Sequence, residues 1–185
     1  MTDFKLKSPT GVIVALDQMS VYLQTSLKRV WSPIGQTPIV RSTPQRDCLK
    51  LYGALEVESG YEMALALPQM NGENTVHFLQ HVLTCIPDRP ILLLWDRATW
   101  HKGVARQFVE AHERLEMVYF PPACPELNPQ EHVWKPTRAA VGHLHDYRHL
   151  TDLRQAFQQH LEQTIFRFNW IDKYFPIQSY NAVLL

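Results

Sequence analysis

Three acidic residues, Asp17, Asp96 and Glu131, have positions that suggest shared chemistry. Asp17 and Asp96 each close a continuously apolar run, residues 11–17 and 91–96, which is typical of strands buried on both faces. Glu131 comes early in a segment that we expect to be helical. Because ligand sites of open α/β sheets gather at the carboxyl ends of the strands, we expect the three side chains to meet there.

Three carboxylates that meet at one edge of a sheet repel one another unless a cation joins them. Carboxylate oxygens are hard ligands, and they select Mg²⁺ or Mn²⁺. Two such ions ~3.5–4 Å apart would stabilise the attacking and leaving oxygens of a phosphoryl displacement. The pattern therefore predicts a metal-dependent phosphoryl-transfer site.

Each acid also has a purely structural interpretation. An Asp at the end of a strand commonly forms a turn or caps a helix. Glu131 has the position of a capping-box residue, because Asn128 would be the N-cap and Pro129 the first helical residue. Capping does not exclude metal binding, and the joint pattern of the three acids favours the catalytic interpretation.

The elements that must position these acids follow from the periodicity of the apolar residues. Asn71 or Asn74 is expected to cap a first helix, and Thr151 a last one with Asp152 in its first turn. The expected strands are residues 11–17, 48–57, 61–67, 91–96 and 115–120, and the expected helices are residues 71–85, 102–114, 130–140 and 149–166. This order predicts a mixed α/β fold in which helices flank a five-stranded sheet. Residues 169–185 are left unassigned.

The bulk composition limits the class of protein. A chain of 185 residues suits one domain, 45% hydrophobic residues suffice for a full core, and 19% charged residues argue against disorder. The formal net charge is zero. Composition therefore gives no support for nucleic-acid binding, since most DNA-binding domains are basic.

The cysteines and the apolar runs predict a soluble cytoplasmic protein. Cys48, Cys85 and Cys124 are odd in number and widely spaced, so neither a disulfide framework nor a zinc site is expected. The first residues contain no apolar signal region. The longest apolar run, residues 91–95, is far too short to span a membrane.

Five sequence blocks resemble the mariner superfamily of DDE transposases, especially its bacterial insertion-sequence members, over roughly residues 11–150. The first acid lies in VALDQMS, and the blocks RVWSPIGQTP and YGALEVESG follow it. The second acid lies in LLLWDRATWHKG. The third lies in YFPPACPELNPQEHVW, which resembles the long and specific block Tyr-x-Pro-x-x-Ser/Cys-Pro-x-Leu-Asn-Pro-x-Glu-x-x-Trp. Between Asp96 and Glu131 lie 34 residues, positions 97 to 130, a separation typical of this superfamily.

The resemblance implies an RNase H-like fold in which Asp17, Asp96 and Glu131 are the catalytic triad and hold Mg²⁺ or Mn²⁺, as two ions. It implies the family's cut-and-paste reaction. Water attacks at the transposon ends to free a 3′-hydroxyl, and this hydroxyl then attacks target DNA, usually at a TA dinucleotide. It also implies transposon ends and target DNA as partners, a homodimer on DNA, and no membrane partner.

Two positions depart from the family pattern, and a proline adds a third irregularity. Gln18 stands where many relatives have Glu, and Arg97 stands where many have Asn. Arg97 places a cation beside the site, where it could contact a phosphate or weaken metal affinity. Pro136 removes a helix hydrogen bond five residues after Glu131, so we expect a kink or break there.

Other side chains near the acids have expected roles. Arg97, Lys102 and Lys135 are candidate DNA contacts, although a solvated helix start would also explain Lys102. His101 is expected to be a hydrogen-bonded structural residue, and Trp134 to pack in the core on the helix face of Glu131. Trp31 either forms a wall near DNA or anchors its loop. His143, His145 and His149 resemble a metal-binding tract, but a polar loop is the expected interpretation.

We expect one catalytic domain over residues 1–185, with its core at about 11–150 and a C-terminal helical extension at about 150–185. Sixteen residues precede Asp17, so the N-terminal helix-turn-helix DNA-binding modules of the family are expected to be absent. Two other functions remain open. One is a catalytically silent RNase H-like interaction domain left from a truncated transposase, and the other is an RNase H-type nuclease that acts on RNA–DNA hybrids.

Overall fold

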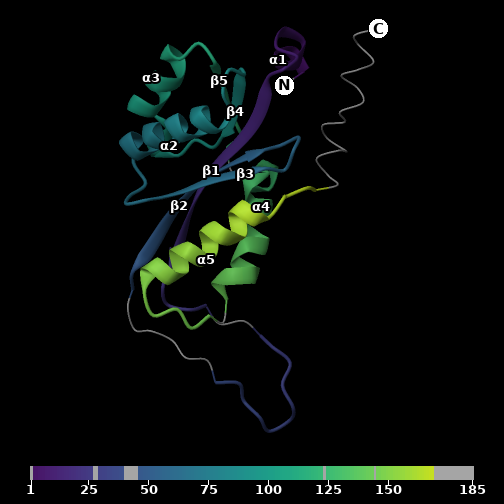
Figure 1. The fold of residues 1–185 in the computed structure, drawn as a ribbon, viewed down its shortest axis with the longest axis vertical. Helices are drawn as coiled ribbons and strands as arrows, with labels where there is room; N and C mark the ends of the chain where they lie inside the picture. The colour runs from purple at the N-terminus through teal and green to yellow at the C-terminus, as the bar shows by residue number, and fades with distance from the viewer. Residues whose placement is uncertain (1, 27–28, 40–45, 123, 144, 169–185) are drawn as a thin grey trace.

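A computed structural model describes residues 2–26, 29–39, 46–122, 124–143 and 145–168. It shows a five-stranded sheet with helices on both faces, which confirms the mixed α/β fold predicted from the sequence (Figure 1). The strands are β1 (Val12–Tyr22), β2 (Cys48–Glu56), β3 (Glu62–Leu67), β4 (Ile91–Trp95) and β5 (Leu115–Tyr119). The α-helices are α1 (Thr2–Lys7), α2 (Gly72–Cys85), α3 (Val104–Ala111), α4 (Gln130–Thr137) and α5 (Leu150–Gln163). Residues 169–185, unassigned from the sequence, lie outside the described residues.

The strands lie in the order β3-β2-β1-β4-β5. β2 pairs antiparallel with both β1 and β3. β4 and β5 run parallel to β1 and to each other, and α2 and α3 provide the crossover connections. The sheet is therefore antiparallel on one side of β1 and parallel on the other.

β1 continues past Asp17 to Tyr22, so the expectation that this strand ends on the acid is wrong. β2 stays hydrogen-bonded to β1 as far as Tyr22, whereas β4 pairs only with residues Val12 to Ala15. The apolar run stops at Leu16 because β1 is fully covered only while β4 lies beside it. Beyond that point its burial alternates, as is typical of an antiparallel strand with one covered face.

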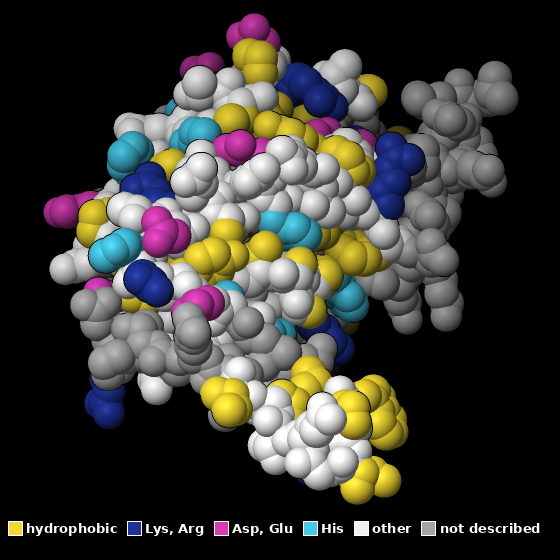
Figure 2. All heavy atoms as spheres, turned by 60° about the horizontal axis from the view of Figure 1, so that its bottom comes forward, with side chains coloured by type: hydrophobic (Ala, Val, Ile, Leu, Met, Phe, Trp, Pro, Cys, Tyr) yellow, Lys and Arg dark blue, Asp and Glu magenta, His cyan; other side chains and the backbone are white. Residues whose placement is uncertain are grey.

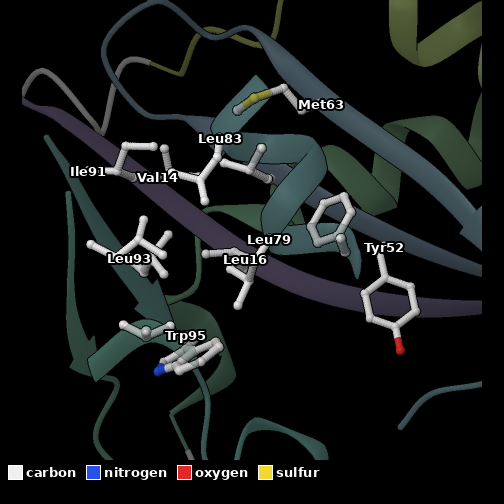
Figure 3. Packing of buried hydrophobic residues seen from close by; sticks show 14 of the residues in the cluster. Val14, Leu16, Tyr52, Met63, Leu79, Leu83, Ile91, Leu93 and Trp95 are labelled. Carbon is white, nitrogen blue, oxygen red and sulfur yellow. The ribbon is translucent and has the colours of Figure 1, made fainter. Parts of the chain in front are cut away.

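Two apolar layers sandwich the sheet. On one face α2 and α3 cover side chains of β1 and β4, including Val14, Leu16 and Trp95 (Figure 3). On the other face α4 packs against β1 and β2, and α5 packs across β2 and β3. Alternation along β1 sends even-numbered side chains to the first layer and odd-numbered ones, such as Met19, to the second.

The helix ends show which local signals decide a boundary. Asn71 caps α2 as expected, since its side chain accepts a hydrogen bond from the backbone N–H of Asn74 at 2.8 Å. Thr151 is not the N-cap of α5, because the helix already begins at Leu150 and His149 is the capping residue. Leu150 packs against the apolar layer under α5, and this burial includes it in the first turn.

Three predicted helices differ in extent from the observed ones, and one of them, expected at residues 149–166, is observed as Leu150–Gln163. The helix expected at residues 102–114 is shortened to α3, because Gly103 takes a φ of +57° that separates α3 from the short 3₁₀ turn Thr99–His101. The helix expected at 130–140 is α-helical only to Thr137 and continues as a π-helical turn to Gly142. The change follows Pro136 directly, which agrees with the expected break.

Residues 29–39 extend away from the sheet as a projecting segment (Figure 1). Its hydrophobic side chains lie on the surface at its tip (Figure 2), and Trp31 and Ile34 are fully exposed. The side chain of Trp31 therefore does not anchor its loop against the described residues. Within the described ranges, no helix is long and apolar enough to cross a membrane. The three cysteines are free thiols.

Phe157 attaches α5 to the sheet, and its side chain is fully buried in the second layer. We expect Phe157→Ala to lower the free energy of unfolding by about 3–5 kcal/mol, because the truncation leaves a cavity between α5 and the strands. Urea unfolding followed by circular dichroism measures this change. Gln159→Ala, on the exposed face of the same helix, should change stability by less than about 0.5 kcal/mol. Equal losses in both variants would contradict the packing of α5.

Candidate active site

The strand register places the first two acids side by side. Ala15 of β1 lies opposite Leu94 of β4, so two residues further on Asp17 and Asp96 lie at the same level. Alternation puts both on the sheet face of Ala15 and Leu94, which belong to one apolar cluster. The two strands separate here, and α4 packs against β1 with Glu131 as its second residue.

All three acids line one pocket of about 400 Å³. The loop that follows β5 forms the opposite wall, with Phe120 and Pro122 among its residues. Glu131 is exposed, whereas Asp17 and Asp96 are partly buried. The structure thus brings together the three residues that the sequence selected.

Asp17 carries most of the electrostatic cost of this arrangement. Burial, together with the negative charges of Glu131 and Asp96, raises its pKa from 3.8 to about 6. The indole N–H of Trp134 donates to Asp17 Oδ2 at 3.1 Å and opposes part of this shift. Trp134 is buried on α4, as expected, and its polar edge holds the first acid of the triad.

Asp96 has the opposite environment. Its Oδ1 accepts hydrogen bonds from the imidazole Nδ1–H of His101 at 2.8 Å and from the backbone N–H of Ala98 at 2.9 Å. The bond from His101 is the main cause that lowers the pKa of Asp96. Since both donors occupy Oδ1, we expect Asp96 to present Oδ2 to a ligand.

A chain of hydrogen bonds fixes the tautomer of His101. Trp100 Nε1–H can only donate, and it donates to Gln18 Oε1 at 2.8 Å. The amide of Gln18 therefore turns its Nε2 towards His101 Nε2, 2.9 Å away, which must accept. The ring proton is left on Nδ1, which faces the carboxylate and the backbone carbonyl of Asp96. His101 is fully buried and acts as the expected structural histidine.

The candidate cations lie in different places. Arg97 lines the pocket, where its guanidinium stacks 5.3 Å from the ring centre of Tyr119 and Nε donates to the carbonyl of Phe120. Lys102 and Lys135 are exposed, and neither is a lining residue of this pocket. Arg97 is thus the cation that the structure places beside the acids.

The turn before α4 differs in part from the predicted capping box. α4 begins at Gln130 with Pro129 as its N-cap residue, and the backbone N–H of Asn128 bonds to the carbonyl of Pro125 instead of the side chain of Glu131. Asn128 Oδ1 accepts a hydrogen bond from the backbone N–H of Gln130 at 3.1 Å, and its amide donates to the carbonyl of Leu16 at 3.4 Å. Asn128 therefore joins the helix that carries Glu131 to the strand that carries Asp17.

The donor set fits a hard divalent cation, because it consists of carboxylates whose mutual repulsion such a cation would offset. Among the described residues, no three His, Cys, Asp or Glu side chains form a ready-made metal-binding group. His143 and His145 are therefore not part of such a metal-binding group, and His143 instead forms a hydrogen bond with Ser26.

The sheet order and the helices on both of its faces define an RNase H-like fold. Residues 12–154 match the family model described as DDE superfamily endonuclease, and the chain belongs to this family. The resemblance to mariner-type DDE transposases predicted from the sequence is thereby confirmed for family and fold.

Particular relatives agree with this assignment. The Mos1 transposase in a paired-end complex with the left transposon end superposes with a TM-score of 0.70 at 16% identity, over 97% of this chain and 56% of that one. The catalytic domain of the Mos1 mariner transposase gives 0.58 at 13% identity, over 88% and 76% of the two chains. An uncharacterized protein of Sinorhizobium fredii (strain NBRC 101917 / NGR234), y4pE/y4sA, is 28% identical over 86 residues, 46% of this chain and 62% of that protein. The chain therefore spans less than two thirds of this protein and of the chain in the paired-end complex.

The sequence did not single out four residues that support the candidate site from behind or beside the acids: Glu62, Gln130, Gly53 and Trp100. Glu62 carried a usable signal, because it is an acid on the strand face whose other members are the small residues Ala64 and Ala66. Gln130 and Trp100 carried none, since their partners are far away in the chain.

The raised pKa of Asp17 predicts how stability depends on pH in the absence of divalent metal. Below pH 3.8 this carboxyl is protonated in both states. Between pH 3.8 and about 6 the unfolded chain loses the proton first, so the folded state is progressively destabilised as pH rises. Asp17→Asn should remove the part of this dependence that comes from Asp17 and raise the free energy of unfolding at pH 7 by up to roughly 3 kcal/mol.

Urea unfolding at several pH values between 4 and 7, with a chelator present, measures the effect. The exposed Asp47→Asn provides the matched control and should leave the pH profile of the wild type in place. A destabilised Asp17→Asn variant at pH 7 would contradict the assigned pKa shift.

The tautomer of His101 can be observed directly. We expect long-range ¹H–¹⁵N correlations of its imidazole to show a protonated Nδ1 and an unprotonated Nε2. Trp100→Phe removes the donor that orients Gln18, but the Nδ1–H tautomer should persist in that variant, because the carboxylate and the backbone carbonyl of Asp96 still face Nδ1. A wild-type ring protonated at Nε2 alone would be incompatible with the hydrogen-bond chain to Asp96.

Proposed function

We propose that this chain is the catalytic domain of a cut-and-paste DNA transposase, which cleaves and joins DNA strands at transposon ends with divalent metal ions. The pocket that collects Asp17, Asp96 and Glu131 is the observation that carries this proposal. Membership of the DDE superfamily endonuclease family supports a nuclease chemistry for the same three acids.

Asp17, Asp96 and Glu131 would hold Mg²⁺ or Mn²⁺, most simply as two ions. Bound metal supplies charge stabilisation at the attacking and leaving oxygens of a phosphodiester. The related Mos1 structures include paired-end complexes with Mg and with Mn. Asp96 suits a ligand role because its lowered pKa keeps it ionised, and His101 holds one of its oxygens still.

Arg97 is the residue of the pocket best suited to a backbone phosphate. Its side chain is exposed and positively charged, and it lines the same pocket as the three acids. Lys102 and Lys135 would contact DNA further from the reacting bond. Contacts of this kind position the strand and carry no sequence information.

The proposed partners are transposon ends and target DNA, with two copies of the chain on paired ends. The Mos1 relatives are described as a paired-end complex, a strand transfer complex and a pre-cleavage transpososome. A formal net charge of zero gives no support for tight DNA binding by this domain alone. We propose that tight binding of the ends depends on modules beyond this single domain, and that the protein acts in the cytoplasm.

A second candidate is a catalytically silent interaction domain with the same fold. It is favoured by one observation, that the described residues contain no ready-made metal-binding group. The two candidates differ in metal affinity, because a silent domain has no need to bind Mn²⁺ at the three acids.

The proposal is tested by single substitutions of the triad. Asp17→Asn, Asp96→Asn and Glu131→Gln should each reduce Mn²⁺-dependent nicking of DNA by more than about 100-fold. This loss is larger than the loss of about 10- to 100-fold that substitution of a residue behind a metal ligand usually causes. Glu126→Gln, an exposed acid five residues before Glu131, is the matched control and should keep full activity. Nicking that survives in all three triad variants would exclude these residues as the catalytic acids.

Calorimetric titration with Mn²⁺ separates the two candidates. An active domain should bind Mn²⁺ in at least one of two conditions, in the presence or in the absence of DNA ends. The Asp96→Asn variant should lose this binding. Wild-type protein that fails to bind Mn²⁺ under both conditions would favour the silent domain.

A further inference from the structure

A buried acid lies behind the proposed active site. Glu62, the first residue of β3, is only 3% exposed and faces the layer covered by α4 and α5. It is not among the residues that line the pocket of the triad. Its position therefore differs from that of a metal ligand, and its role must come from what it contacts.

Its direct partner is Gln130, the residue before Glu131. The amide Nε2–H of Gln130 donates to Glu62 Oε1 at 2.6 Å, and the side chain of Gln130 is fully buried. Gln130 begins α4, so this bond ties the start of the helix to β3. One turn later Trp134 ties the same helix to β1 through Asp17. Glu131 lies next to the first of these two attachments.

A notch in β2 lets both attachments reach the sheet. Gly53 pairs with Asp17 on one side and with Ala64 of β3 on the other. A Cβ at Gly53 would contact three side chains of this site at 2.3 to 2.5 Å, far inside van der Waals distance: Gln130, Trp134 and Glu62. The absent side chain is therefore a requirement for the approach of α4.

The hydrogen bonds around Glu62 indicate its protonation state. Two buried atoms of the pair, Glu62 Oε2 and Gln130 Oε1, have no partner among the described residues. A carboxylate would leave two such acceptors without a donor, which is costly in the interior. A carboxylic acid supplies one O–H, and the unpaired amide oxygen can accept it. Burial raises the pKa of Glu62 well above its usual value and acts in the same direction, and it outweighs the opposing hydrogen bonds from Gln130 and from the backbone of Ala54.

The charged groups around Glu62 do not replace this partner. Asp17 faces it from β1, and its negative charge disfavours ionisation of Glu62. Arg154 and Glu162 of α5 line a small cavity that Glu62 also borders, and they bring charges of opposite sign.

We propose that Glu62 and Gln130 form a neutral acid–amide pair that positions α4, and with it Glu131, against Asp17 across the notch at Gly53. Glu62 is thus a positioning residue for the metal site, and this role rests on the function proposed above. The pair works by shape and hydrogen bonding, and it needs no negative charge on Glu62.

Substitutions that keep or remove the pair test this role. Glu62→Gln replaces the acid by a neutral group of the same shape, which can still donate and accept. Glu62→Leu removes the pair and leaves the buried amide of Gln130 without a partner. The double variant Glu62→Gln with Gln130→Glu exchanges the two groups. Glu116→Gln and Glu116→Leu, at an exposed position of β5, are the matched controls.

Two readouts are measured on the whole chain: Mn²⁺ affinity by calorimetry, and the indole ¹H–¹⁵N resonance of Trp134, assigned with Trp134→Phe. Glu62→Gln and the exchanged pair should keep the resonance and bind Mn²⁺ within about threefold of the wild type. Glu62→Leu should shift the resonance and weaken Mn²⁺ binding by about 10- to 100-fold, as changes behind a metal site do.

A loss in Glu62→Gln as large as in Glu62→Leu would show that a charge on Glu62 is required, and would overturn the proposal. An unchanged resonance in Glu62→Leu would overturn it as well. If Glu62→Leu does not fold, a folded exchanged pair with a displaced Trp134 resonance overturns the proposal, and a retained resonance supports it. Because the Trp134 resonance is recorded without metal, it decides the positioning role even if the wild type fails to bind Mn²⁺, an outcome that counts against the proposed function alone.

Discussion

The burial of Asp17 within a long strand is the constraint on which the rest of the structure depends. The carboxyl group of Asp17 lies in the middle of β1 and faces two further acids. Because it is largely held away from water, its pKa is raised. The fold tolerates this because Trp134 donates to it and because β4 ends beside it, which opens a pocket. Destabilised acids of this kind are typical of sites that bind a cation.

Different kinds of contact place the three acids in the pocket. Asp17 and Asp96 are fixed by the hydrogen-bonded register of two parallel strands, so their relative position is a property of the sheet. Glu131 lies on a helix, and its position depends on the hydrogen bond from Asn128 to the carbonyl of Leu16 and on the contacts around Gly53. The third acid is therefore the one whose placement small changes in packing would disturb first.

The two strand acids also differ in their surroundings, which gives them different proton affinities. Asp96 lies at an exposed strand end, where His101 and a backbone N–H stabilise its charge. Asp17 lies inside the sheet and has one indole donor from α4. A cation shared by the two acids would therefore displace a proton chiefly from Asp17 as pH falls towards about 6.

Much of the fold was determined by the sequence by itself: the five strands and their order along the chain follow from local patterns of apolar residues, and the same patterns singled out the three acids as candidates. What only the tertiary structure decided depends on partners distant in the chain. β1 extends beyond Asp17 because β2 pairs with it there, and Leu150 joins α5 because a buried layer covers it. The contacts of Glu62 with Gln130 and of Gln18 with Trp100 join residues more than 60 positions apart, so no local period could reveal them.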